Sequence, residues 1–186
     1  MDVTTILIPI IAVVFVAAIL YFISIYNKLY SLRNSAEATL GQIRVALKKR
    51  LDMIEQLVDV VKSYAKFEKE TLERITSLRT EVFKAGAAGL GDIDRESRMI
   101  LNGVVAVAEN YPTLRASEPA QKLMEAIRDV EDEIARQRYT YNNITQEFNT
   151  MLDTIPSKFV ASWRRMVKLE YLKFEEEVEK RPETKL

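Results

Sequence analysis

Side chains that could carry out chemistry are scarce in this chain of 186 residues. It contains neither cysteine nor histidine, which excludes thiolate nucleophiles, Cys-ligated metal sites and the commonest general base and transition-metal ligand. A ferritin-like di-iron site is excluded as well, because it needs Glu-x-x-His pairs on facing helices. No acidic cluster matches a calcium-binding loop. We therefore expect no metal, no cofactor and no catalytic residue, and we interpret the protein as not an enzyme.

Four polar residues interrupt or border the apolar stripes of the predicted helices. Glu131 and Arg138 border one stripe and Gln137 lies on it, whereas Glu68 interrupts another. Together they could form a polar site inside a helical core, or a polar layer that fixes how the helices are aligned. We expect the polar layer, because one such layer in an apolar core is ordinary in helical bundles.

The charges are balanced, with 27 Lys and Arg residues against 27 Asp and Glu residues. Binding to nucleic acid requires a basic face, so we expect no nucleic-acid partner. We interpret the basic residues 48–50 as a solvated helix face. Arg164, Arg165 and Lys168 are interpreted as a polar face beside Trp163, which we expect to lie in the core.

Residues 3–27 form a run of 25 residues without a charge. As a helix this run would be about 37 Å long, enough to cross a hydrocarbon core of about 30 Å. It is too long for a signal peptide and lacks the basic start of one, so residues 1–27 are predicted to be a retained transmembrane anchor. Lys and Arg residues follow the run and none precedes it. The positive-inside rule then predicts a single-pass protein of the cell membrane, with the N-terminus outside and the C-terminal domain in the cytoplasm.

Apolar residues at helical spacing predict four further helices. They are expected over residues 28–84, from Asp92 or Asp94 to Tyr111, over residues 117–153, and from Ser157 toward residue 179. A glycine-rich loop over residues 85–91 separates the first two. Ile134 and Tyr141 lie at the centre of the clearest stripe and are expected in the core.

The predicted fold is all-α, an N-terminal transmembrane helix followed by an antiparallel four-helix bundle with a long first helix. The bundle is expected over residues 28–181, with a frayed tail over residues 182–186. The first bundle helix would be roughly 85 Å long and the third about 55 Å. Part of the first helix is therefore expected to pack on a second copy of the chain. The candidate interface residues are Leu40, Ile43, Leu47 and Leu51.

Several motifs in a fixed order resemble the LemA family of membrane proteins. The most specific are Glu109-Asn110-Tyr111-Pro112 and the pairs Tyr141-Asn142 and Phe148-Asn149, and the resemblance covers nearly the whole chain. The chain departs from the family at Glu55, where a proline is frequent, and at Ile155, where phenylalanine is usual. The resemblance implies a short outer N-terminus, one membrane helix and an antiparallel helical bundle. It implies no catalytic residues, since the family has no established activity.

Three function classes are compatible with these observations. The first is a membrane-anchored scaffold or adaptor that self-associates and recruits protein partners through helix faces. The second is a single-pass sensor or signal-relay protein, which the short outer segment, residues 1–5, disfavours. The third is an enzyme that uses only carboxylates, lysines or hydroxyl groups, which the lack of His and Cys disfavours. We favour the scaffold, with the lipid bilayer, further copies of the chain and unidentified proteins as its partners.

Overall fold

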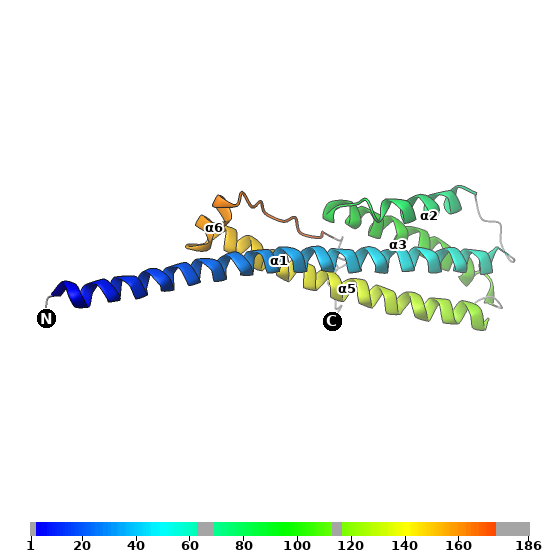
Figure 1. Ribbon diagram of the computed structural model, residues 1–186. Helices are drawn as coiled ribbons and strands as arrows, with labels where there is room; N and C mark the ends of the chain where they lie inside the picture. Colours follow the sequence, from blue (N-terminus) through cyan, green and yellow to red (C-terminus); the bar gives the residue numbers. More distant parts are fainter. Residues whose placement is uncertain (1–2, 63–68, 113–116, 174–186) are drawn as a thin grey trace, which may run out of the picture. The chain divides into compact units, whose positions relative to one another are not determined.

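The computed structural model describes residues 3–62, 69–112 and 117–173, with the side chains of residues 3–6 left out (Figure 1). This part of the chain is all-α, as predicted. The helices are α1 (Val3–Val61), α2 (Lys69–Glu81), α3 (Ala87–Glu109), α5 (Glu118–Asp153) and α6 (Ser157–Trp163). Contacts divide the chain into two compact units. Unit 1 contains Met1–Ala38 and Asn142–Leu169, and unit 2 contains Thr39–Tyr141 and Glu170–Leu186.

Helix α1 confirms the predicted long apolar helix at the N-terminus. Its most apolar window of 18 residues has a mean hydropathy of 2.8, and only 6% of that window is buried. In the described part of the chain it is the one helix long and apolar enough to cross a membrane. Pro9 lies in the second turn of α1, where it removes one backbone hydrogen bond of the helix. The helix continues without a break to Val61.

The helix expected over residues 28–84 is divided, so the prediction of one long element is wrong at this point. Helix α1 ends at Val61 and α2 begins at Lys69. Arg79 of α2 lies 2.7 Å from Asp52 and 2.6 Å from Glu55 of α1, so α2 folds back along α1 (Figure 1). The apolar stripe continues through both helices because both pack against one core, and neither proline nor glycine marks the division.

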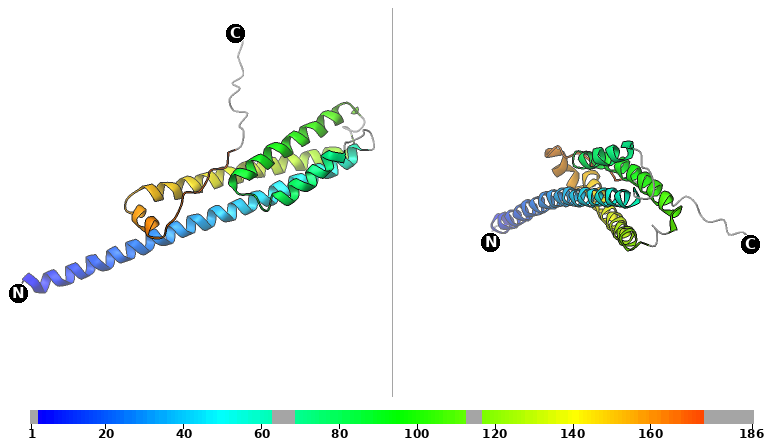
Figure 2. Two further views of the ribbon diagram at one scale, coloured as in Figure 1. Left: turned by 90° about the horizontal axis from the view of Figure 1, so that it is seen from above. Right: turned by 90° about the vertical axis from the view of Figure 1, so that its right-hand side faces the viewer.

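Unit 2 packs four helical segments around a common apolar core. They are the last part of α1, then α2, α3 and the first part of α5, which lie side by side in the views of Figures 1 and 2. Ile134 and Tyr141 are 1% and 3% exposed, which confirms both as core residues. The other buried apolar residues include Ile43, Leu47, Ile54, Leu57, Ile75, Leu78, Leu90, Val104 and Val130.

Unit 1 has its own small core, formed by Ile25, Leu29, Leu32, Phe148, Val160 and Ala161. The last predicted helix is much shorter than expected, since α6 ends at Trp163 and residues 166–173 are not helical. Arg165 has a φ of 50° and closes the helix. Its amide donates to Ser162 O and that of Met166 to Ala161 O, each at 3.0 Å, which is the pattern that commonly ends helices.

Asn149 of α5 explains why the chain after α6 is extended. Its Nδ2 donates to the carbonyl oxygen of Leu169, and the Leu169 amide donates to Asn149 Oδ1, both at 2.9 Å. The side-chain amide therefore satisfies both backbone groups of Leu169, as a neighbouring strand would. Asn149 is only 7% exposed, so it lies inside unit 1 and not at the flank of the helix.

Candidate functional site

A fully buried arginine is the central polar feature of unit 2. Arg50 of α1 is 0% exposed. Its Nη1 lies 2.8 Å from Asp94 Oδ1 and donates to Glu131 Oε1 at 2.7 Å. Its Nη2 donates to the backbone carbonyl oxygen of Asp94 at 3.0 Å and to the hydroxyl of Ser97. One side chain thus joins α1 to α3 and α5.

Arg98 completes the network from α3. Its Nε lies 3.0 Å from Asp94 Oδ2, and its Nη2 lies 2.9 Å from Glu131 Oε2. Two guanidinium groups therefore face two carboxylates, and the cluster has no net charge. The cluster connects α1, α3 and α5 through four ion pairs.

The structure corrects the interpretation of residues 48–50. Lys49 is exposed and Lys48 half-buried, but Arg50 lies in the core. Its forked guanidinium can satisfy several acceptors at once, which a buried lysine could not do in the same geometry. The sequence does contain a signal for this position. Ile43, Leu47, Arg50, Ile54 and Leu57 follow one another at alternating spacings of four and three residues, so Arg50 occupies an apolar position of the stripe.

The predicted polar residues are only partly brought together. Glu131 belongs to the Arg50 network. Gln137 and Arg138 are half-buried, about 10 Å further along α5. Glu68 lies outside the described residues. Asp94 and Ser97, which sequence analysis did not select as core polar residues, are 3% and 0% exposed.

The candidate interface residues pack inside the chain. Ile43, Leu47 and Leu51 are 0% exposed, and Leu40 is half-buried. The stripe that suggested an interface is the stripe that the other helices of unit 2 cover. Val45, which is 61% exposed, is the large apolar residue on the outer side of α1 in this region.

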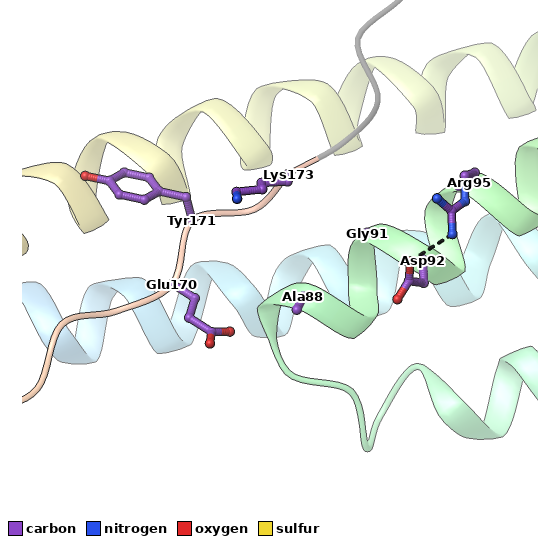
Figure 3. A pocket seen from close by; sticks show the side chains of 7 residues that line it. All are labelled: Ala88, Gly91, Asp92, Arg95, Glu170, Tyr171 and Lys173. Carbon is purple, nitrogen blue, oxygen red and sulfur yellow. Dashed lines mark hydrogen bonds and ion pairs between the residues drawn. The ribbon is translucent and has the colours of Figure 1, made fainter.

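A groove of about 670 Å³ lies in unit 2 between the start of α3 and the extended residues 170–173 (Figure 3). Its lining contains acids and bases, among them Asp92 and Arg95, which are paired at 3.0 Å. The hydroxyl of Tyr141 donates to the carbonyl oxygen of Glu170 at 3.0 Å and so holds this segment on α5. The groove shows how the C-terminal segment is seated and brings together no catalytic set.

Of residues 85–91, which their glycines predict to be a loop, only residues 85 and 86 lie outside the helices. Helix α3 begins at Ala87, after Gly86, so neither Asp92 nor Asp94 caps it. Gly91 lies inside the helix, and a Cβ there would stand 2.5 Å from the carbonyl oxygen of Lys173. The glycine therefore allows the extended segment to approach the helix backbone.

A second ion-pair cluster connects α2 with α3. Arg74 binds both carboxylate oxygens of Glu96, and its Nη1 lies 3.0 Å from Glu81. The hydrogen bond to Glu96 raises the pKa of Arg74. A hydrogen bond from Ser77, together with the charge of Arg74, lowers the pKa of Glu81. These shifts keep both partners charged and fit a structural role. No group of three or more acids in residues 3–62, 69–112 and 117–173 is arranged to hold a metal ion.

Unit 1 contains a cluster of aromatic rings and one arginine. The rings of Phe22 and Trp163 are 5.9 Å apart. Arg164 donates to the hydroxyl of Tyr30 from Nε at 3.2 Å and from Nη2 at 2.9 Å, and its guanidinium lies 5.7 Å from the Tyr26 ring. The hydrogen bond from Arg164 lowers the pKa of Tyr30. Trp163 is 67% exposed, so the prediction that it lies in the core is wrong.

Comparisons with known proteins give a consistent result. The model of the LemA family matches residues 39–186. Magnetosome protein MamQ 2 of Paramagnetospirillum magneticum is 23% identical over 173 residues, covering 78% of this chain and 64% of the relative. Protein LemA of Metamycoplasma hominis is 28% identical over 147 residues, covering 77% and 67%. Magnetosome protein MamQ of Magnetospirillum gryphiswaldense is 21% identical over 173 residues, covering 78% and 64%. The chain spans less than two thirds of the length of these MamQ relatives.

Proposed function

This chain belongs to the LemA family, and on that basis we propose that it is a membrane-anchored, non-catalytic helical scaffold or adaptor that self-associates in the cell membrane. The observation that carries the proposal is helix α1. The same helix is apolar and almost wholly exposed over its most hydrophobic window, and it contributes the buried Arg50 and Leu47 to unit 2. An exposed apolar helix of this length needs a bilayer to cover it.

The polar clusters support a role other than catalysis. In the Arg50 network each of the two carboxylates is paired with two guanidinium groups, and the acids around Arg74 are paired with it. Enzymes instead keep titratable groups near their substrates with pKa values matched to proton transfer. A protein whose two buried or half-buried charge clusters join helices is suited to presenting surfaces to partners.

Anchoring of the chain in a membrane favours self-association. Copies held in one membrane are confined to a plane, which raises their effective concentration, so modest lateral contacts are sufficient. Because Ile43, Leu47 and Leu51 are covered within the chain, we place the contact on the membrane-spanning part of α1 and on the outer side around Val45.

The test is the mass of the full chain in mild detergent, measured by light scattering over a wide range of concentration and after cross-linking. We expect a multiple of the chain mass. Val45→Glu should lower that mass, whereas Arg136→Glu, a change at an exposed position of α5, should leave it unchanged. A parent chain that is monomeric at every concentration would remove the scaffold proposal.

Signal relay is a second candidate, favoured by the continuity of α1. One helix connects the apolar segment with Arg50, without a hinge in between. A rotation or shift of the membrane segment would thus be carried toward the polar network. Inserting four alanines after Ala38 turns the helix by roughly 40°. A relay should lose its output after this insertion, whereas a scaffold should keep its mass and its partners.

A further inference from the structure

Helix α6 has apolar residues on both sides. Val160 and Ala161 are buried in the core of unit 1, at 1% and 2% exposure. On the outer side, Phe159 and Trp163 are four residues apart and are 66% and 67% exposed, and Ile155, just before the helix, is 75% exposed. A helix between a protein core and water carries polar residues on its outer side. These three residues, which we call the α6 surface, are those of a helix that faces an apolar medium.

The contacts of α6 place this surface where the uncharged run of α1 ends. The Trp163 ring lies against Phe22, which belongs to that run. Arg164 lies against Tyr26 and Tyr30, at its end and just beyond it. Tryptophan and tyrosine are enriched at the level where hydrocarbon meets the lipid headgroups. If α1 crosses a bilayer, Trp163 therefore stands at the boundary and Arg164 at headgroup level.

The charge around the α6 surface is complementary to lipid phosphates. Residues 154–169 contain four basic residues and no acidic residue. They are Lys158, Arg164, Arg165 and Lys168. Lys168 is engaged by Asp153 at 2.7 Å, from just outside this stretch. Basic side chains beside an exposed apolar helix face are the composition of helices that lie in the membrane interface.

We propose that α6 is an interfacial helix that lies in the membrane leaflet from which α1 emerges. Ile155, Phe159 and Trp163 insert between the headgroups and the upper acyl chains, and Lys158 and Arg164 bind the phosphates of anionic phospholipids. This inference rests on the membrane anchoring of the proposed function. It adds that the bundle is fixed to the bilayer at a second place, which restrains how unit 1 is oriented on the membrane.

Trp163 is the sole tryptophan of the chain, so the full-length protein carries its own reporter. The protein is reconstituted into vesicles of phosphatidylcholine and phosphatidylglycerol whose acyl chains carry bromine either near the headgroup or near the methyl end. We expect bromine near the headgroup to remove roughly half of the emission and bromine near the methyl end to remove much less. Protection from acrylamide in the water should accompany this quenching.

The control moves the reporter away from the α6 surface. The variant Tyr139→Trp combined with Trp163→Phe places the tryptophan at an exposed position of α5, where the side chain is 71% exposed. Brominated lipid should not quench it, and acrylamide should. Equal behaviour of the two reporters would overturn the proposal, whether both were quenched by lipid or both by acrylamide.

Two further measurements distinguish anchoring by α1, insertion of α6 and phosphate binding by the basic residues. Resistance of the protein to alkaline extraction reports on α1 alone. If the protein resists extraction but acrylamide still quenches Trp163, then α1 anchors the protein in the membrane and α6 does not lie in the interface. Quenching that is unchanged in vesicles of phosphatidylcholine alone would overturn the role of the basic residues. We expect it to fall by about a factor of two in those vesicles.

Discussion

At the residue scale, Arg50 shows how a charge can be kept inside an apolar core. The guanidinium meets a carboxylate of α3, a carboxylate of α5, a backbone carbonyl and a hydroxyl. Removing water from a charge is costly, and only a complete set of partners offsets that cost. Arg50 therefore needs the two carboxylates to offset its loss of hydration, and each carboxylate needs Arg50 for the same reason.

Arg50→Met tests this dependence. The apolar side chain fills much of the same space but leaves Asp94 and Glu131 without their buried cation, so we expect a loss of about 3–5 kcal/mol in the free energy of unfolding. Arg98→Met removes a half-exposed cation from the same carboxylates and should cost under about 1 kcal/mol. Urea unfolding of the full chain in detergent, followed by circular dichroism, measures both. Equal losses would show that Arg50 is not the centre of the network.

Two glycines of α3 provide a matched pair. A Cβ on Gly91 would stand 2.5 Å from the carbonyl oxygen of Lys173, whereas one on Gly103 meets nothing within 4 Å. Gly103→Ala should stabilise the protein by about 0.5–1 kcal/mol, because alanine favours the helix. Gly91→Ala gains the same helical preference but forces residues 170–173 away, and we expect a net loss of about 1–3 kcal/mol. The same unfolding measurement compares them, and equal gains would show that this segment is not seated on α3.

At the element scale, the stripes of apolar residues predicted which segments are helical and which side faces the core. They failed at the ends of the elements. No proline or glycine marks the division between α1 and α2, so periodicity alone suggested one helix. The extended chain after α6 is held by Asn149, whose side chain binds Leu169 twenty positions away, and contacts of that range cannot be read from local patterns.

The candidate site residues were only partly predictable from the sequence. Glu131 was found because it borders a stripe, but its partner Arg50 was assigned to a solvated face from its basic neighbours. Trp163 was placed in the core because it shares one face of the predicted last helix with Val160 and Val167. Its exposure is explained by its contact with Phe22, which places the ring near the end of the uncharged run of α1. In both cases the missing information was a contact between residues far apart in the sequence.

The side of α5 that faces the core can be tested with adjacent residues. Ile134 is 1% exposed and packed inside unit 2, so Ile134→Ala should cost about 2–5 kcal/mol of unfolding free energy. Glu133→Ala, at the half-buried position beside it, should cost under about 0.5 kcal/mol. Both values come from chemical unfolding of the full chain in detergent. Similar small losses at the two positions would mean that another side of α5 faces the core.

At the scale of the whole molecule, α1 determines what the protein can do. Its apolar part is almost entirely exposed, while the last part of the same helix carries Arg50 and much of the core of unit 2. One element thus serves both as the candidate membrane span and as a structural member of the bundle. Insertion of α1 into a membrane would therefore be linked to the folding of unit 2 through a single helix.

We expect the charges beside this helix to set its orientation in the membrane. Lys28 and Arg33 follow the uncharged run directly, and no lysine or arginine precedes it. Positively charged flanks are retained in the cytoplasm, so we expect the chain after residue 27 to be cytoplasmic. Alkaline phosphatase, which is active only outside the cytoplasm, should be inactive when fused after Leu186, whereas green fluorescent protein at the same place should fluoresce. The control inserts four lysines after Asp2 and replaces Lys28 and Arg33 with Gln, which removes the asymmetry and should turn part of the population around. An active phosphatase on the unaltered chain would reverse the orientation, and with it the leaflet assigned to α6.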